Sequence, residues 1–173
     1  MGNVFAVKDI EFKVAVGGRN TGQDNFWAIA GMESFAITFD NGIDEWSPID
    51  ARGWVKRMIT SKSMTVSVAG KRVVGCAGND YVAGLGFRAG ESAATILWVT
   101  FPNGDSLIFE CIVNVTASGG GASSDVAVLE FDCLSDGQPF YRRANGDLVS
   151  HVAQIDLSEP DVSFDLEGGK ENV

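Results

Sequence analysis

The chain has 173 residues, 45% of them hydrophobic, with 23 acidic and 13 basic side chains for a net charge of −10. This composition is typical of a globular domain with a buried core and excludes a disordered chain. The negative charge opposes tight binding to nucleic acid, which depends on Lys and Arg neutralising phosphates, and no apolar run is long enough for a transmembrane helix.

Two further features bear on location and domain organisation. The N-terminal stretch lacks the basic start and apolar run of a secretory signal, and three widely spaced cysteines indicate free thiols in a reducing compartment. The charge is uneven, because residues 144–173 hold seven acids and one Lys, a net of −6, which leaves −4 for residues 1–143. We therefore predict a β domain over residues 1–143 and an acidic C-terminal arm over residues 144–173.

Alternating apolar and polar residues predict a series of short β-strands. The segments concerned are residues 11–16, 26–31, 34–40, 63–69, 94–116 and 126–134. The pair Asn41–Gly42 predicts a turn, and Asn79 is placed to cap a short helix over residues 79–87. These elements indicate a mainly β fold, a β-sandwich or split β-barrel with one or two short flanking α-helices and a long inter-strand loop.

The long inter-strand loop is the connection over residues 43–62, which exceeds the usual length of loops in compact domains. Apolar residues recur within it at helical spacing, and Asp50 can cap a short helix there. Because Trp is enriched at protein–protein contacts, the loop docks either over its own sheet or on a partner, and the residues alone leave both alternatives open. The side chains expected to dock are Trp46, Trp54, Met58 and Ile59.

A hairpin is predicted over residues 94–116, where Asn103–Gly104 separates two runs rich in β-branched and aromatic residues. If those two residues form the turn, partners across the hairpin have numbers that sum to 207. One face is then apolar and fits a core. The other face mixes apolar and polar side chains and predicts a surface that another chain covers; its members include Leu97, Val99, Ile108, Glu110 and Ile112.

No motif for catalysis, cofactor binding or metal binding stands out. The single histidine, His151, lies in the acidic arm with no nucleophile in its sequence context. The acidic residues between positions 40 and 50 fit a solvated loop better than a cation site. We therefore expect no catalytic, cofactor-binding or metal-binding residues, and a protein that is not an enzyme.

Several short segments nevertheless occur in a distinctive order. They are FWAIAG at 26–31, Glu45 with GWVK at 53–56, SKSMTVSVAGK at 61–71, Gly75, Asn79–Asp80, PNG at 102–104, the glycines at 119–121 and SDGQP at 135–139. Their order and spacing resemble those of the major tail proteins, or tail tube proteins, of long-tailed siphophages. The resemblance covers residues 25–143 and leaves out the acidic arm.

This resemblance implies a structural protein of the virion tail, assembled in the host cytoplasm without a membrane. Such proteins form hexameric rings that stack into a tube for DNA, and other tail proteins join the tube ends. The long loop with Trp46, Trp54, Met58 and Ile59 would then contact the next ring. The hairpin surface would form the wall between neighbouring subunits or toward the lumen, where an acidic lining lets DNA slide without sticking.

A second class of protein also fits the residues. A monomeric β-sandwich binding module, of carbohydrate-binding or adhesin type, could use Trp46 and Trp54 as a platform for a sugar. The N-terminal sequence and the odd number of cysteines disfavour this alternative, because such modules are commonly secreted and disulfide-bonded.

Overall fold

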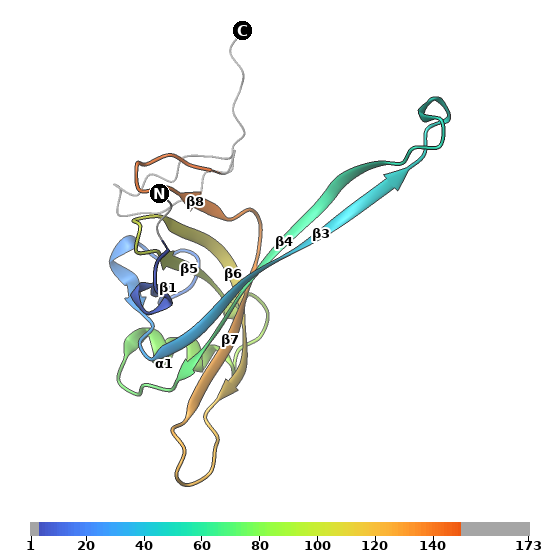
Figure 1. Cartoon of the computed structure of the whole chain (residues 1–173). Helices are drawn as coiled ribbons and strands as arrows, with labels where there is room; N and C mark the ends of the chain where they lie inside the picture. Colours follow the sequence, from blue (N-terminus) through green and yellow to red (C-terminus); the bar gives the residue numbers. More distant parts are fainter. Residues whose placement is uncertain (1–3, 150–173) are drawn as a thin grey trace.

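The structure, a computed structural model, describes residues 4–149, and β-strands dominate this range (Figure 1). Eight strands, one α-helix and four short 3-10 turns follow one another along it. The strands are β1 (Glu11–Ala15), β2 (Phe26–Ala28), β3 (Met32–Trp46), β4 (Lys56–Lys71), β5 (Ala94–Thr100), β6 (Ser106–Ser118), β7 (Val128–Ser135) and β8 (Phe140–Arg142); the helix is α1 (Ala77–Leu85); the 3-10 turns are η1 (Val7–Asp9), η2 (Gln23–Asn25), η3 (Ile49–Ala51) and η4 (Gly90–Ala93).

All eight described strands belong to one antiparallel sheet. The order is β2-β1-β5-β6-β7-β4-β3, and β8 pairs with β6 beyond the end of β7. The sheet does not close on itself, so β2 and β3 are left as its two edges. The predicted mainly β fold with a short flanking helix is confirmed, in the form of one open sheet.

A single main core lies on the inner face of this sheet. Side chains from both ends of the strand order join it, because β1 contributes Phe12 and Val14 while β3 contributes Phe35 and Ile37. Strand alternation explains which residues point inward, since every second residue is buried from Met64 to Gly70 of β4 and from Leu107 to Val113 of β6. The largest fully buried strand side chains are Val14, Val66, Val68, Ile96, Leu97, Val99, Phe109, Leu129 and Phe131.

Helix α1 confirms the short helix predicted over residues 79–87, but the predicted role of Asn79 as its cap is wrong. Cys76 holds the cap position, and Asn79 lies inside the helix with its side chain fully buried. Its amide group donates to the carbonyl oxygens of Ala30 (2.9 Å) and Lys71 (3.0 Å). Its carbonyl oxygen accepts the backbone N–H of Val73 (3.1 Å). Asn79 therefore joins the segment between β2 and β3 to the segment between β4 and α1.

The predicted hairpin of β5 and β6 is present, but its predicted register is wrong by one residue. Leu97 pairs with Phe109 and Val99 pairs with Leu107, so the numbers of partners sum to 206. A slip of one residue in a strand exchanges the faces of its side chains relative to its partner. Leu97 and Val99 consequently lie on the core face, whereas the outer face holds Ile108, Glu110 and Ile112.

The turn of this hairpin gives the physical reason for the different register. The N–H of Gly104 donates to the carbonyl oxygen of Phe101 (2.9 Å), and the N–H of Phe101 donates to that of Asp105 (2.9 Å). The connection is therefore a three-residue loop, a type I turn followed by Gly104 at φ 88°. Pro102 favours this arrangement because its fixed φ suits the second position of a type I turn.

Candidate functional site

The segment predicted as a long loop with a short helix is instead an extended β-hairpin. Strands β3 and β4 stay paired as far as Trp46 and Lys56, and η3 is the only helical turn between them in the described chain. The predicted turn at Asn41–Gly42 is wrong, because β3 continues through it. A register shift between Gly42 and Ile43 marks a β-bulge, which interrupts the alternation that a strand normally shows. We call residues 40–63 the arm, as distinct from the acidic C-terminal segment, and we call the rest of the described chain the body.

The arm extends away from the rest of the molecule (Figure 1). β4 pairs with β7 only between Thr65 and Lys71, so beyond Thr65 the sheet is reduced to the two strands of the arm. A two-stranded ribbon by itself is marginally stable in water. Such a structure is expected to gain order by packing against another surface.

The four side chains predicted to dock all lie on the arm and are exposed. The exposed fractions are 45% for Trp46, 80% for Trp54, 57% for Met58 and 50% for Ile59. The helical face predicted for Trp54, Val55, Met58 and Ile59 is wrong, because Met58 and Ile59 lie in strand β4. Trp46 and Met58 lie on one face of the ribbon, Ile59 pairs with Ile43 on the opposite face, and Trp54 lies in the connection at the tip.

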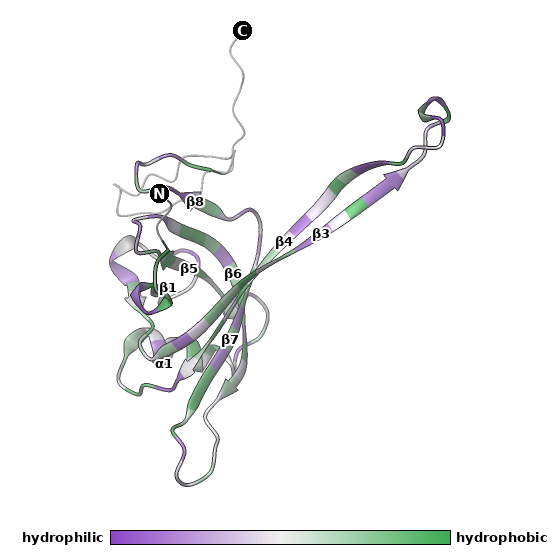
Figure 2. Cartoon of the chain, in the orientation of Figure 1, coloured by the Kyte–Doolittle hydropathy of each residue, from purple (hydrophilic) through white to green (hydrophobic). Residues whose placement is uncertain are grey.

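The arm therefore presents apolar groups on both of its faces, and Figure 2 shows hydrophobic and hydrophilic stretches following one another along it. Within the arm, Arg57 forms an ion pair with Glu45, its cross-strand partner. Both partners are more than half exposed, and an exposed pair of this kind contributes little to stability. Contiguous exposed apolar surface on a folded chain usually marks an interaction site.

The tip of the arm, the connection between β3 and β4, contains a tight turn. Arg52 and Gly53 both have positive φ, at 51° and 86°, and the N–H of Trp54 donates to the carbonyl oxygen of Ala51 (3.0 Å). A positive φ is uncommon for a residue with a side chain, so Arg52 is a point of backbone strain. The side chain of Ile49, in the same connection between β3 and β4, is fully exposed.

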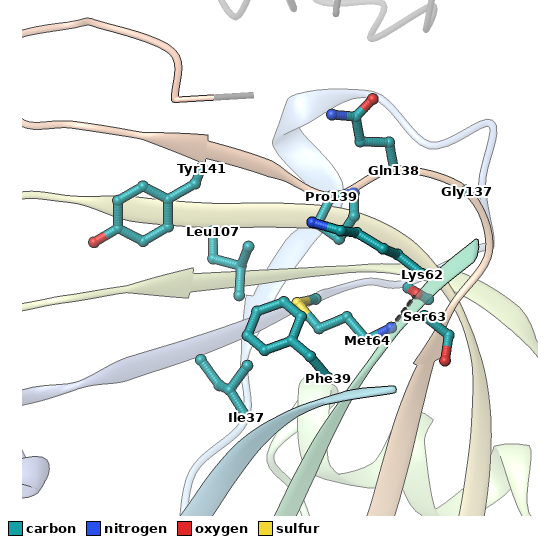
Figure 3. Close-up of a pocket in the computed structure, with 11 residues that line it drawn as sticks. Ile37, Phe39, Lys62, Ser63, Met64, Leu107, Gly137, Gln138, Pro139 and Tyr141 are labelled. Atoms are coloured by element: carbon teal, nitrogen blue, oxygen red, sulfur yellow. Dashed lines mark hydrogen bonds between the residues drawn. The ribbon is translucent and has the colours of Figure 1, made fainter. Parts of the chain in front are cut away.

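A pocket of about 820 Å³ opens where the arm leaves the body (Figure 3). Phe39 and Met64 line it from the base of the arm, and Leu107 and Tyr141 line it from β6 and β8. The lining includes one charged side chain, that of Lys62. The pocket is thus mainly apolar and continues one face of the arm into the body.

Hydrogen bonds from Tyr141 and Ala144 to Asp105 hold one wall of this pocket in place. The hydroxyl of Tyr141 donates to Oδ2 of Asp105 (2.7 Å), and the N–H of Ala144 donates to Oδ1 of the same carboxylate (2.9 Å). Burial and the bond to Asp105 raise the pKa of Tyr141 to about 12. The hydrogen bonds from Tyr141 and Ala144 lower the pKa of Asp105. These hydrogen bonds connect the end of β8 to the turn between β5 and β6.

The surface predicted around the central hairpin is not one continuous face. Leu97 and Val99 belong to the core, with 1% and 0% of their surfaces exposed. On the outer face, Ile108 is also buried, in a small cluster that Trp98 covers. Glu110 lies within 3.5 Å of Arg19 and is held in an ion pair. This part of the sheet is largely covered by the chain's own residues.

Another region of the outer face, across β3, β4, β7 and the second half of β6, is polar and carries small side chains. Cross-strand pairing aligns Ala36, Ser67, Asp132 and Asn114 in one row, and Ser67 donates to Asp132 (2.6 Å). The next row on this face, toward the end of β4 and the start of β7, pairs Ala69 with Glu130. None of the residues named in these rows is among the site residues predicted from the sequence. The signal was available in the polar positions that alternate with the buried ones along these strands.

The described residues offer little for redox or metal chemistry. No group of three or more His, Cys, Asp or Glu side chains comes together within residues 4–149 to hold a metal ion. Cys111 and Cys133 are buried, and the contact with Cys111 and burial raise the pKa of Cys133 well above its usual value. In the same range no helix is long and apolar enough to cross a membrane. His151 lies outside the described residues.

The fold is similar to that of two chains from gene transfer agent particles. No protein-family profile and no curated protein matches the sequence. A chain from the tail of an empty gene transfer agent particle with C6 symmetry matches with a TM-score of 0.61 and 18% identity, covering 79% of this chain and 97% of that one. A chain from the virion of a native gene transfer agent particle matches with a TM-score of 0.57 and 21% identity, covering 80% and 98%. At these identities the likeness is one of fold.

Proposed function

We propose that this chain is a structural subunit that assembles into stacked rings and so forms the tube of a phage-like tail. The observation that carries the proposal is the arm, a paired ribbon with exposed apolar side chains on both faces and at its tip. A monomer would leave these groups in water, whereas a subunit in an assembly can bury them. The fold match to the C6-symmetric tail of a gene transfer agent particle supports a ring of six.

In this assembly the arm contacts the neighbouring ring. Trp54 and Ile49 at the tip are the most exposed apolar residues of the arm, and aromatic anchors of this kind dominate binding energy at interfaces. The contact joins the arm of one copy to a different surface of another copy. Such heterologous contacts extend into open assemblies rather than closing a dimer. Burial of Trp46, Met58 and Ile59 along the ribbon completes the interface.

The sheet supplies the contacts within a ring. β3 is an edge strand of 15 residues, and a long free edge in the described sheet is a site where another strand can pair. Pairing between the edges of neighbouring copies would make their sheets continuous around the ring. Of the residues predicted for the wall of the ring, Ile112 and Glu110 lie on the outer face of β6, in the middle of the sheet. Leu97, Val99 and Ile108 are buried, so they can only support that wall from within the subunit.

The polar outer face that carries Ser67, Glu130 and Asp132 is the surface that best fits the lumen. Small hydroxyl and carboxylate side chains stay hydrated, and their negative charge repels the phosphates of DNA. DNA would therefore pass through the tube without tight binding. The chain would act in the tail of the particle without catalysis, meeting other tail proteins at the ends of the tube.

The experiment is electron microscopy and sedimentation of the purified full-length protein over a range of concentrations and salt. Rings or tubes that grow with protein concentration are the expected result. Salt is varied because the proposed inter-ring contact is mainly apolar and should survive an increase in ionic strength. A chain that stays monomeric under every condition would overturn the proposal.

A further inference from the structure

The end of the sheet opposite the arm carries a second exposed apolar surface. Val74, shortly after β4, is 81% exposed, and Val126, shortly before β7, is 62% exposed. The N–H of Arg72 donates to the carbonyl oxygen of Ala127 (2.9 Å), which extends the pairing of β4 with β7 and brings the two segments side by side. We call Val74, Asp125 and Val126 the end patch.

Strand β4 connects the arm to the end patch. It begins at Lys56, next to the tip, and ends at Lys71, three residues before Val74. A strand of 16 residues spans about 50 Å, so the tip and the end patch lie far apart. Figure 1 shows the arm at one end of the sheet and the loop between β6 and β7 at the other end. Two copies placed end to end in the same orientation therefore bring the tip of one toward the end patch of the other.

The tip and the end patch also match in chemistry. The tip presents Ile49 and Trp54, and the end patch presents its two valines. Arg52 is exposed on the tip, and Asp125 is exposed on the end patch, where its carboxylate accepts the N–H of Ala122 (2.7 Å). Neither Arg52 nor Asp125 is in an ion pair with another residue of the range 4–149. Opposite charges beside an apolar contact favour one orientation of the partners.

Hydrogen bonds on either side of Val74 keep this part of the end patch in place. The N–H of Val73 donates to Oδ1 of Asn79 (3.1 Å), and the N–H of Gly75 donates to Oδ2 of Asp80 (3.0 Å). The exposed side chain of Val74 is therefore held at the surface. A preformed surface of this kind loses little conformational freedom when a partner binds.

We propose that the tip of the arm of one copy docks on the end patch of a copy in the next ring. Trp54 would pack against Val74 and Val126, and Arg52 would lie beside Asp125. This inference rests on the proposed function and adds to it the surface that receives the arm. Because the two surfaces differ, each added ring again offers a free tip or a free end patch, and the stack can grow.

Val126→Asp tests the proposal in the full chain by placing a charge in the end patch. The side chain is mostly exposed, so the urea midpoint should stay unchanged. We expect electron microscopy to show separate rings and no tubes, under conditions in which the unmodified chain forms tubes. Phe87→Asp is the matched control, because Phe87 is 91% exposed and α1 separates it from Val74. This control should form tubes of normal length.

The outcomes separate this inference from the proposed function. Tubes of normal length from Val126→Asp would overturn the inference and leave tube assembly standing. An unmodified chain that forms neither rings nor tubes would overturn the proposed function, and the inference with it. A loss of tubes in both Val126→Asp and Phe87→Asp would also contradict the assignment of the end patch.

Crosslinking within assembled tubes gives a second measurement that needs no added charge. Ile49→Cys and Val126→Cys are combined in a chain in which the half-buried Cys76 is replaced by Ser, while the two other cysteines are buried. A short bismaleimide should join one chain to the next and give a ladder of covalent multimers. The matched control carries Phe87→Cys in place of Val126→Cys and should stay monomeric. Tubes that give no ladder with the first pair, or equal ladders with both pairs, would overturn the inference.

Discussion

The ring of Phe12 on β1 packs edge-on against the ring of Phe35 on β3, with centroids 5.3 Å apart and planes inclined by 67°. β1 and β3 stand near opposite ends of the strand order, so this contact shows that the sheet curls until its ends approach. Edge-to-face aromatic pairs of this kind are favourable beyond the area they bury. The curl closes the core of the body while β3 and β4 run on past it into the arm.

Asn79 holds two connections of the body together, so replacing it should destabilise the subunit. In Asn79→Leu the carbonyl oxygens of Ala30 and Lys71 and the N–H of Val73 lose a buried partner. Unsatisfied buried groups of this kind cost about 1–3 kcal/mol each, so we expect a loss of at least about 2 kcal/mol in the free energy of unfolding. Urea denaturation measures it. Asn114→Leu, on an exposed position of β6, is the matched control and should change stability little.

The corrected register predicts different outcomes for two residues that the sequence placed on one face. Leu97→Ala removes a fully buried core side chain and should cost about 3 kcal/mol. Ile112→Ala, on the partly exposed outer face, should cost clearly less. Urea denaturation of the two variants makes the comparison. A larger loss at Ile112 than at Leu97 would contradict the observed faces.

The pair formed by Asp105 and Tyr141 predicts a pH dependence of stability. Folding lowers the pKa of Asp105 below its ordinary 3.8, so its contribution is complete above that value and is lost as the pH falls through the folded pKa. Folding raises the pKa of Tyr141 from 10.0 to about 12, so its contribution is complete below 10 and is lost as the pH rises through 12. Near neutral pH both contributions are present.

Tyr141→Phe removes this hydrogen bond and should therefore lower the urea midpoint near neutral pH. The difference from the unmodified chain should shrink below the ordinary pKa of Asp105, because the carboxyl group is then protonated in both chains. Tyr81→Phe, at the other tyrosine, is the control and should show no such change with pH. A difference for Tyr141→Phe that is the same at low and neutral pH would contradict the assigned role of Asp105.

Shortening the arm should separate folding from assembly. Replacing residues 43–60 by a two-residue Asn-Gly turn removes the exposed part of the hairpin, and that part has no third strand beside it. We expect the body to unfold at the same urea concentration as the full chain and to form no tubes. Trp54→Ser should weaken assembly in the same direction. Phe87→Ser, at a residue 91% exposed outside the arm, is the matched control and should assemble normally.

Most strands and the short helix could be predicted from the sequence, because the spacing of apolar residues along a strand or a helix is a local property. The arm could not be predicted as a hairpin, because its bulge between Gly42 and Ile43 breaks the alternation and its apolar residues are also spaced as in a helix. The predicted register of the β5–β6 hairpin was wrong because of one residue, Pro102. Its preference for the second position of a type I turn gives a three-residue loop in place of the two-residue turn that Asn–Gly predicts.

The candidate site could be predicted in part. Trp46, Trp54, Met58 and Ile59 were singled out, and all four are exposed on the arm. The pocket beneath the arm could not be foreseen, because it forms from residues of β3, β4, β6 and β8 that only the curled sheet brings together. A cavity between strands distant in the chain has no local signature in the sequence.

Cryo-electron microscopy of the assembled protein tests the central claim most directly. The account predicts stacked rings in which the arm of each subunit lies on the next ring, with Trp54 buried at that contact and the face bearing Asp132 toward the lumen. An assembly in which the arm folds back on its own subunit, or extends into solvent away from any neighbour, would contradict it.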